Sequence, residues 1–339
     1  MLRGRSPRGW SLSRRRPCTP WRRRVTGSAA HPSYSIVIPV YGSVSLVGRT
    51  IDRTVAFCVD HDLDYELVLV NDGSIDGSWD VIAAAAETNP RVIAVDLLRN
   101  YGQHTAVLAG MRIATGDYVI TMDDDLQNPP EEIGRLIERA GEGYDLVIGQ
   151  FTERHHPRYR QLGTMMVGWM NRRIFGKPKD LALTNFRCIR RDVVDRMTAH
   201  RTFAPYIPGL ALMYSAARTN VWVDHQAREG GGSSYSFWKL LALVFRITFN
   251  YSSLPLRVVS AVGLFVTVLS FALGAFWLLR ATFVGIRVPG FASLALMLAL
   301  FNGVALLILS MLGEYTVRLL NQMSAADAYH VRETVRHVD

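Results

Sequence analysis

Short β-rich segments alternate with helical segments from Tyr34 to about Gln226, and this alternation leaves the chain few possible folds. The predicted strands are Tyr34–Val40, Tyr65–Val70, Val92–Leu97, Tyr118–Met122, Asp145–Ile148 and Asn220–Val223. The predicted helices are Val44–Asp60, Gly77–Glu87, Gln103–Thr115, Pro130–Ala140 and Tyr159–Phe175. Elements in this order are typical of a mostly parallel sheet with helices on both faces. The sequence therefore predicts an α/β fold for this part of the chain.

Polar turns follow four of the predicted strands. They read Pro39-Val-Tyr-Gly, Asn71-Asp-Gly-Ser, Arg99-Asn-Tyr-Gly-Gln-His and Asp123-Asp-Asp. Turns favour Gly, Asn and Asp in any protein. In open α/β sheets, however, ligands bind beyond the carboxyl ends of the strands, so four such turns outline one site. The chain has no G-x-G-x-x-G after the first strand and no G-x-x-x-x-G-K-[ST], which removes the usual support for dinucleotide or P-loop phosphate binding.

Three carboxylates, Asp123, Asp124 and Asp125, follow one another at the end of a predicted strand. Like charges repel, and Mg²⁺ or Mn²⁺ prefers carboxylate oxygens, so a metal ion would relieve this crowding. Alternation along a strand would send Asp123 and Asp125 to one side and Asp124 to the other, which leaves an Asp-x-Asp pair able to share one metal. An acidic turn that caps the helix beginning near Pro129 is the alternative, and the triplet alone favours neither interpretation.

Two long uncharged segments lie near the end of the chain. They are Val258–Leu279, which is bounded by arginines, and Pro289–Gly313, which is followed by a glutamate. Each exceeds the roughly 20 residues that a helix needs to cross a bilayer. We expect a hairpin of two transmembrane helices, at about 258–279 and 290–312, rather than two buried core helices. The link between them carries arginines, so the positive-inside rule does not settle the orientation.

The segment Ser236–Tyr251 predicts a helix that lies in the membrane interface. Ser236, Lys239, Arg246 and Asn250 fall on one helical stripe, and large apolar residues fill the rest. A basic amphipathic helix directly before a membrane hairpin is typical of an interfacial helix, although an ordinary core helix has the same pattern.

The net charge of +9 has a local origin, because the first 30 residues contain nine arginines and no acid. This arm has no continuous apolar stretch and is therefore not a secretory signal. Its composition indicates a disordered, solvated arm, with anionic lipid or nucleic acid as less favoured partners of the arm. For the chain as a whole we expect no nucleic-acid partner. Cys18, Cys58 and Cys188 fit neither a disulfide framework nor a zinc site, which favours a reducing compartment.

Several short runs together resemble one protein family. The runs are Ser35-Ile-Val-Ile-Pro-Val-Tyr, Val70-Asn-Asp-Gly-Ser-x-Asp-Gly-Ser, Arg99-Asn-Tyr-Gly-Gln-His, Thr115-Gly-Asp-Tyr, Asp123-x-Asp-Leu-Gln-Asn-Pro-Pro-Glu, Asn185-Phe-Arg, Gly231-Gly-Ser-Ser-Tyr-Ser, Leu254-Pro-Leu-Arg and Gly313-Glu-Tyr. In order and spacing, from about Ser33 to Glu333, the chain resembles the family 2 glycosyltransferases of GT-A fold that charge polyprenyl phosphates. The likeness is greatest to the bacterial undecaprenyl-phosphate sugar transferases, which include bactoprenol glucosyltransferases and formamido-arabinose transferases.

The resemblance implies a domain organisation. A disordered arm over residues 1–32 would precede a GT-A (Rossmann-like) catalytic domain over 33–230. An interfacial helix region over 231–254, two transmembrane helices within 255–313 and a cytoplasmic C-terminal tail over 314–339 would follow.

The resemblance also implies roles for the residues at matching positions. The nucleotide sugar would be bound by Pro39, Tyr41, Asp72, Tyr101, Gln103, His104 and Asp123, with Asp72 reading the base or ribose. A divalent Mg²⁺ or Mn²⁺ ion on the donor diphosphate would be held by Asp125, Gln127 and Asp123. The catalytic set would be Asp125, Asp123 and Arg187, which faces the transferred phosphate region. The acceptor phosphate would contact Arg154, Arg160, Thr164, Arg228 and Lys239.

Two positions depart from the pattern of this family. The middle position of the Asp cluster is commonly Ala, whereas this chain has Asp124, which we expect to point away from the metal and to matter least of the three. Many members carry a basic residue before Tyr235, where this chain has Ser234. If that position contacts phosphate, Arg228 or Lys239 would have to replace it.

The function that the resemblance implies is inverting transfer of a sugar from a nucleoside diphosphate to polyprenyl phosphate, which gives a lipid-linked sugar for the cell envelope. A phosphate monoester has a second pKa of about 6, so the acceptor is already charged at neutral pH and needs no general base. Such an enzyme would lie in the plasma (inner) membrane, contact membrane lipid, keep its catalytic domain in the cytoplasm and form a homo-oligomer.

Two alternatives to this function stay open. One is a membrane glycosyltransferase that acts on a lipid or polysaccharide hydroxyl, although the Gln-x-x-Arg-Trp of processive synthases is absent. The other is a non-catalytic membrane scaffold with a transferase fold, and the presence of Asp72, Asp123, Asp125 and Arg187 argues against it.

Overall fold

The computed structural model describes residues 32–151, 158–202, 204–224, 226, 290–323 and 328–337, together with short stretches between 248 and 283. Nearly all of the predicted arm over 1–32 lies outside the described residues. The same holds for most of the predicted interfacial region over 231–254 and for much of the first apolar segment.

A single sheet of eight strands organises the described part of the chain, in the order β7-β5-β6-β4-β1-β2-β3-β8. The strands are β1 Tyr34–Val40, β2 Tyr65–Asn71, β3 Val92–Leu97, β4 Tyr118–Thr121, β5 Leu146–Phe151, β6 Arg187–Arg190, β7 Arg218–Val223 and β8 Val331–Arg336. β1 pairs in parallel with β2 and β4, β2 pairs in parallel with β3, and β5 pairs in parallel with β7. β6 and β8 run antiparallel to their neighbours. The sheet is therefore mostly parallel, as the sequence predicts.

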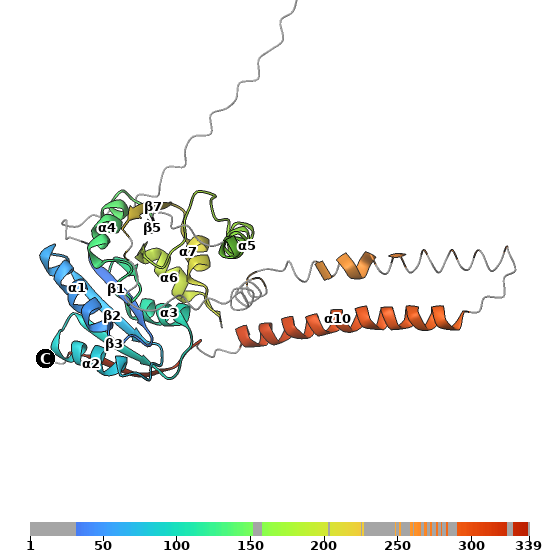
Figure 1. Ribbon diagram of the computed structural model, residues 1–339, viewed down its shortest axis with the longest axis horizontal. Helices are drawn as coiled ribbons and strands as arrows, with labels where there is room; N and C mark the ends of the chain where they lie inside the picture. Colours follow the sequence, from blue (N-terminus) through green and yellow to red (C-terminus); the bar gives the residue numbers. More distant parts are fainter. Residues whose placement is uncertain are drawn as a thin grey trace, which may run out of the picture. The chain divides into compact units, whose positions relative to one another are not determined.

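Helices cover both faces of this sheet. Their bounds are α1 Val47–Asp60, α2 Ser78–Thr88, α3 Gln103–Ile113, the 3-10 turn η1 Pro130–Glu132, α4 Ile133–Gly141, α5 Arg158–Phe175, α6 Arg191–Ala199 and α7 Ile207–Tyr214. One core cluster joins α1, α2 and α4 to one face, and another joins α3, α5, α6 and α7 to the opposite face. Figure 1 shows α1 and α2 on one side of β1 to β3 and α3 on the other. Alternating strand residues supply both clusters, for example Ile36 to the first and Val37 to the second.

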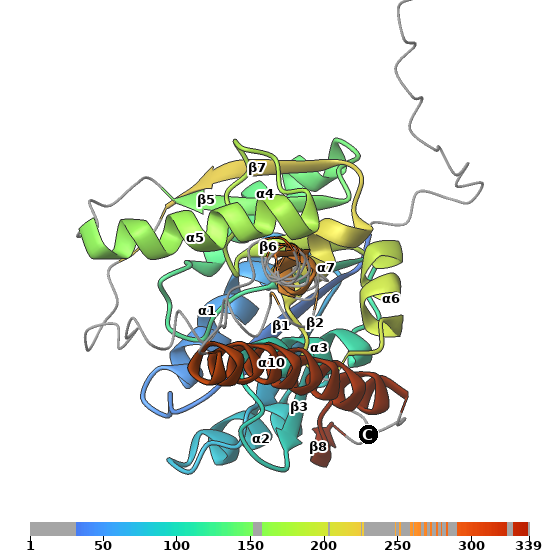
Figure 2. The same ribbon diagram turned by 90° about the vertical axis from the view of Figure 1, so that its right-hand side faces the viewer.

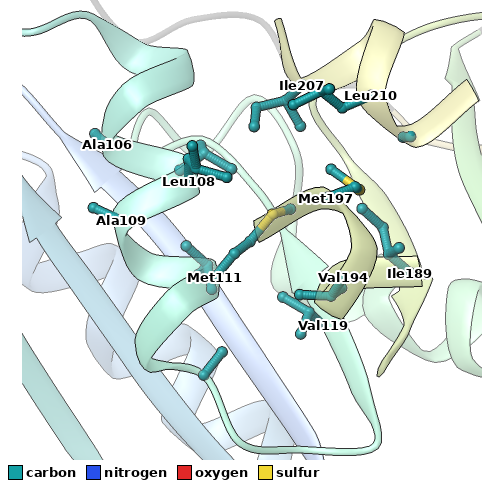
Figure 3. Packing of buried hydrophobic residues seen from close by; sticks show 14 of the residues in the cluster. Ala106, Leu108, Ala109, Met111, Val119, Ile189, Val194, Met197, Ile207 and Leu210 are labelled. Atoms are coloured by element: carbon teal, nitrogen blue, oxygen red, sulfur yellow. The ribbon is translucent and has the colours of Figure 1, made fainter. Parts of the chain in front are cut away.

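The second cluster fixes α3 between the sheet and two later helices. Leu108 and Met111 of α3 point toward Met197 of α6 (Figure 3), and all three side chains are buried. Burial of each such side chain stabilises the fold by ~1.5–3 kcal/mol. Gly110 brings α3 close to β1, because a Cβ at this position would lie 2.4 Å from Cγ1 of Val37. The helix that begins at the third polar turn is therefore rigidly placed.

Most of the predicted elements are confirmed, and β1 and β3 have the predicted bounds. β6, β8, α6 and α7 were not predicted from the sequence. The predicted C-terminal tail over 314–339 contains β8, which pairs with β3 at the edge of the sheet (Figure 2). The strand was missed because Val331–Arg336 is polar and mostly exposed, as an edge strand allows.

Helix α10 spans Phe291–Met323 and so continues ten residues past the predicted boundary at residue 313. In the part of the chain that the structure describes, no helix combines the length and the apolar character that a membrane crossing requires. The two-helix hairpin therefore stays a prediction.

Candidate active site

The carboxyl ends of four parallel strands form one rim of the sheet. β1, β2, β3 and β4 run in the same direction and end at Val40, Asn71, Leu97 and Thr121. β6 runs the opposite way and begins at this rim, because Arg187 pairs with Thr121. β1 lies between β2 and β4, so the chain order reverses there. Open α/β sheets bind ligands at such a reversal, and all four polar turns lie beside it.

Asp72 joins the second polar turn to the third. Its Oδ1 accepts a hydrogen bond from the N–H of Tyr101 at 2.7 Å, and its Oδ2 accepts one from the N–H of Gly102 at 2.9 Å. Gly73 permits this approach, since its φ is +69° and a Cβ there would lie 2.5 Å from the carbonyl carbon of Arg99. Burial raises the pKa of Asp72, against the effect of its two N–H donors. Each carboxylate oxygen has a second lone pair, which leaves acceptor capacity for a ligand.

The first polar turn is held in place by the second turn and by the start of α2. The N–H of Gly42 donates to Oγ of Ser74 at 3.2 Å, and the N–H of Ser43 donates to Oγ of Ser78 at 3.1 Å. The side chain of Tyr41 is left 59% exposed. An exposed aromatic ring on a fixed turn can stack on a nucleotide base.

Asp123 lies among side chains from two other elements. Its carboxylate accepts hydrogen bonds from Nε2 of Gln103 and, at 3.3 and 3.4 Å, from Nδ2 of Asn185. Burial, followed by the charge of Asp125, raises the pKa of Asp123 to about 6, although the Asn185 hydrogen bond acts in the opposite direction. The two carboxylates therefore repel each other in a partly buried setting, and a divalent cation would relieve that repulsion.

Asp124 faces the first polar turn instead. Its carboxylate accepts hydrogen bonds from the hydroxyl of Ser43 and, at 3.3 Å, from the N–H of Tyr41. Its backbone carbonyl accepts one from Oγ1 of Thr50 at 3.0 Å. Burial raises the pKa of Asp124, and the Ser43 hydroxyl lowers it. Asp124 thus has different partners from Asp123 and links two turns of the site. That it matters least of the three carboxylates stays a prediction.

Asp125 begins a tight turn. Its Oδ1 accepts a hydrogen bond from the N–H of Gln127 at 3.1 Å, and Leu126 between them has φ +57°. A non-glycine residue in the left-handed region is often found at functional sites. No group of three or more His, Cys, Asp or Glu side chains within the described residues could hold a metal ion by itself. Asp123 and Asp125 nevertheless offer the oxygen ligands that Mg²⁺ and Mn²⁺ prefer, so the residues fit a metal that takes further ligands from a bound substrate.

Arg187 is a buried cation behind the Asp cluster. Its Nη2 donates to Oδ1 of Asn185 at 2.9 Å, while its buried Nε has no hydrogen-bond partner among the described residues. Burial lowers the pKa of Arg187 to about 10, with the charge of Asp123 opposing this, so the side chain is charged at neutral pH. Buried groups without partners are rare in folded proteins. A free N–H on a buried guanidinium is suited to an anionic ligand.

His104 and Tyr206 complete the wall around Arg187. The two rings meet edge to face, with centroids 5.3 Å apart. Burial, followed by the charge of Arg187, lowers the pKa of His104 to about 4, so the imidazole is neutral at pH 7. The hydroxyl of Tyr251 accepts a hydrogen bond from the N–H of Tyr206 and donates one to the carbonyl of Ala204, both at 3.1 Å. The last residue of the predicted interfacial helix therefore packs beside the site.

The structure brings together most of the residues that the resemblance implies for the donor. Those at the rim are Tyr41, Asp72, Tyr101, Gln103, His104, Asp123, Asp125, Gln127 and Arg187, while Pro39 is buried within β1. The predicted acceptor contacts are not placed. Arg154, Arg228 and Lys239 lie outside the described residues, and Arg160 and Thr164 belong to α5 with side chains outside them.

Sequence reasoning missed several contacts of the site. Asn185, which contacts both Asp123 and Arg187, was recognised only as part of a run. Ser43 and Tyr206 were not singled out at all. The only sequence signal for Asn185 was its place directly before the Phe-Arg pair. Its role depends on the antiparallel pairing of β6 with β4, which joins segments far apart in the chain.

Comparisons with known proteins show the family to which the chain belongs. Residues 35–204 match the family described as "Glycosyl transferase family 2". An undecaprenyl-phosphate 4-deoxy-4-formamido-L-arabinose transferase of Pseudomonas aeruginosa (strain LESB58) is 38% identical over 318 residues, covering 89% of this chain and 90% of that protein. The protein of the same name from Proteus mirabilis (strain HI4320) is 36% identical over 304 residues, covering 89% and 93%.

One of the solved structures to which the chain shows some similarity is glucosyl-3-phosphoglycerate synthase from Mycobacterium tuberculosis, crystallised with Mn²⁺, UDP-glucose and phosphoglyceric acid. It is 17% identical, with a TM-score of 0.48, and the match covers 64% of this chain and 77% of that one.

Proposed function

Because the chain belongs to glycosyl transferase family 2, we propose that it transfers a sugar from a nucleoside diphosphate to an undecaprenyl-type polyprenyl phosphate, with inversion at the sugar carbon. The observation that carries the proposal is the buried Arg187, whose Nε has no hydrogen-bond partner among the described residues and which begins β6 at the same rim as the Asp cluster. The relatives named for such a transfer match about nine tenths of the chain, at 36–38% identity.

The donor would lie along the first three turns of the rim. The exposed Tyr41 would stack on the base, and the free lone pairs of Asp72 would accept hydrogen bonds from the base or ribose. Asp123, which Gln103 and Asn185 orient, would lie next to the ribose or the sugar. The many hydrogen bonds between these turns support this assignment, because a fixed frame reduces the entropy lost when the donor binds.

A divalent Mg²⁺ or Mn²⁺ ion would be held by Asp125, Gln127 and Asp123. When bound, such an ion neutralises the charge that develops on the departing diphosphate. The raised pKa of Asp123 beside Asp125 supports this site, since crowded carboxylates gain most from a cation.

The acceptor phosphate would lie beside Arg187. A phosphate monoester is charged at neutral pH and can attack the sugar directly, so the chain has no need of a general base. His104, whose pKa is lowered to about 4, is too weak a base to take a proton from the acceptor at pH 7. Its ring would instead pack against Tyr206 and form part of the wall of the site. The fork of Arg187 would hold the phosphate in line with the breaking bond, and its burial strengthens that attraction.

A membrane setting belongs to the same proposal. Polyprenyl phosphate keeps its tail in the bilayer, so the rim must reach the membrane surface. The uncharged segments at about 258–279 and 290–312 would form a transmembrane hairpin, with an interfacial helix before it. The contact of Tyr251 with Tyr206 supports a position of this helix next to the site. We place the enzyme in the plasma (inner) membrane as a homo-oligomer, with its catalytic domain in the cytoplasm.

The test is a transfer assay with the full chain in membranes or detergent. Undecaprenyl phosphate, Mn²⁺ or Mg²⁺ and a panel of radiolabelled nucleotide sugars are supplied, and label in the lipid phase is measured. We expect one donor to give a phosphate-linked lipid product that mild acid hydrolyses. Label in a product that resists mild acid, or transfer to dolichol-type alcohols but not to the phosphate, would favour a hydroxyl acceptor. No transfer with any donor would favour the non-catalytic scaffold.

A further inference from the structure

The C-terminal strand brings an arginine to a buried carboxylate near the donor rim. β8 lies beside β3 (Figure 2), and Nη1 of Arg332 lies 3.0 Å from Oδ2 of Asp96. Nη2 of Arg332 donates to the carbonyl of Leu98 at 2.8 Å. The Asp96 side chain is only 2% exposed, whereas that of Arg332 is 57% exposed. Arg332 therefore compensates a negative charge that water barely reaches.

Hydrogen bonds connect the carboxylate of Asp96 to the first two polar turns. Nδ2 of Asn71 donates to Oδ1 of Asp96 at 2.7 Å, and Oδ1 of Asn71 accepts from the N–H of Ser74 at 3.1 Å. Oγ of Ser74 in turn accepts from the N–H of Gly42, next to Tyr41. A continuous series of hydrogen bonds thus leads from Arg332 to the turn that would hold the nucleotide.

The charge on Asp96 determines how the next residue is oriented. An ionised carboxylate only accepts hydrogen bonds, so the amide of Asn71 must present its NH₂ group to Asp96 and its oxygen to Ser74. If Arg332 is removed, the carboxylate of Asp96 loses the cation that holds it beside β8, so it can shift away from Asn71. The amide of Asn71 then loses its fixed orientation, which would break its contact with the N–H of Ser74.

We propose that Arg332 is a positioning residue for donor binding, which acts through Asp96 and Asn71 on the turns that contain Ser74 and Gly42. The proposal rests on the donor assignment made above and extends it to a strand outside residues 35–204, which match the family. Because β8 begins eight residues after the end of α10, the strand also joins the C-terminal end of that helix to the donor site.

The test compares nucleotide binding with thermal stability in the full chain. Uridine, guanosine and thymidine diphosphates with Mn²⁺ are first compared on the wild-type protein by calorimetry, and the tightest one becomes the probe. Arg332→Met should weaken its binding about tenfold, equivalent to ~1.4 kcal/mol, and raise the donor KM with little change in the acceptor KM. Arg336→Met removes a charge from the same strand and should bind the probe like the wild type.

Two further variants separate positioning from simple anchoring of the strand. Arg332→Lys keeps the charge and should retain most of the affinity. Asp96→Asn combined with Arg332→Met removes both charges while leaving an oxygen for Asn71, so it should bind more tightly than Arg332→Met alone. If Arg332→Met does not fold, Arg332→Gln, which removes the charge but keeps a polar side chain, takes its place alone and in the double variant.

Two results would overturn the proposal. One is a lower Tm with unchanged probe affinity and donor KM, which would make β8 an anchor only. The other is equal affinity in the single and the double variant. If the wild type binds the diphosphate but transfers no sugar to polyprenyl phosphate, the proposed function fails while the binding comparison still decides the role of Arg332.

Discussion

The hydroxyl of Ser43 donates a hydrogen bond to the carboxylate of Asp124, and this contact joins the turn after β1 to the turn after β4. The N–H of Tyr41 donates to the same carboxylate at 3.3 Å. The two turns flank the position where the order of the strands reverses. Asp124 therefore connects the turn proposed to bind the nucleotide with the turn proposed to bind the metal, although Asp124 itself is not predicted to be a metal ligand.

We predict that Asp124→Ala weakens donor binding more than it slows transfer. The substitution removes the acceptor of two hydrogen bonds that hold the Tyr41 turn, each of which contributes about 0.5–1.5 kcal/mol, or up to 3 kcal/mol when the acceptor is charged. The donor KM should rise about tenfold or more, with a smaller change in kcat. Steady-state kinetics with varied donor and saturating acceptor measure both.

The partner of Asp124 supplies the control. Ser43→Ala removes the same contact from the other side, so the double variant should lose less than the sum of the two single losses. Strictly additive losses would show that the contact itself is unimportant for donor binding.

A second prediction concerns two glycines with similar backbone angles. Gly73 has φ +69° and Gly42 has φ +64°, but a Cβ at Gly73 would lie 2.5 Å from backbone of Arg99, whereas nothing lies within 4 Å of a Cβ at Gly42. Gly42→Ala should cost only ~1–2 kcal/mol for the left-handed conformation. Gly73→Ala should cost clearly more and weaken nucleotide binding, because the turn beside Asp72 must move. Urea unfolding and calorimetry compare the pair, and equal losses would refute the steric explanation.

The sequence predicted those parts of the fold that depend on local pattern. β1 and β3 are mostly apolar runs between polar turns, and their predicted bounds are confirmed. The four turns could be assigned to one rim because parallel strands connected by helices end at the same edge. The helices and strands that define the donor side of the site therefore followed from residue periodicity.

The remaining parts depend on pairing between distant segments. β6 has only four residues and begins and ends with arginine, so no local pattern marks it, yet its pairing with β4 places Arg187 at the rim. β8 is polar and gains its structure from β3. The direction of the Asp124 side chain was predicted from strand alternation. However, β4 ends at Thr121 and the three Asp residues follow it, so alternation does not apply to them.

A third prediction concerns removal of the metal. Asp125→Ala should abolish sugar transfer and the increase in nucleoside diphosphate affinity that Mn²⁺ produces, because Asp125 supplies a ligand oxygen. Chelation of the wild type should have the same effect and be reversed by added Mn²⁺. Asp117→Ala, at the opposite end of β4, is the matched control and should keep the metal response. Transfer that survives both chelation and Asp125→Ala would exclude a metal-assisted mechanism.

The last prediction is a pH dependence of stability that arises from His104. Burial and Arg187 lower the pKa of His104 to about 4, from an ordinary value of 6.5, with the ring of Tyr206 against it. Between these two values the unfolded chain binds a proton that the folded chain does not, so the free energy of unfolding falls as pH falls through this window. The contribution of His104 to stability is therefore complete above pH 6.5 and is lost progressively toward pH 4. His104→Gln cannot take up this proton, so its Tm should fall less steeply than that of the wild type between pH 6.5 and pH 4, whereas the difference between the two proteins should be constant above pH 7. Parallel curves across the whole range would show that His104 titrates alike in the folded and unfolded chains.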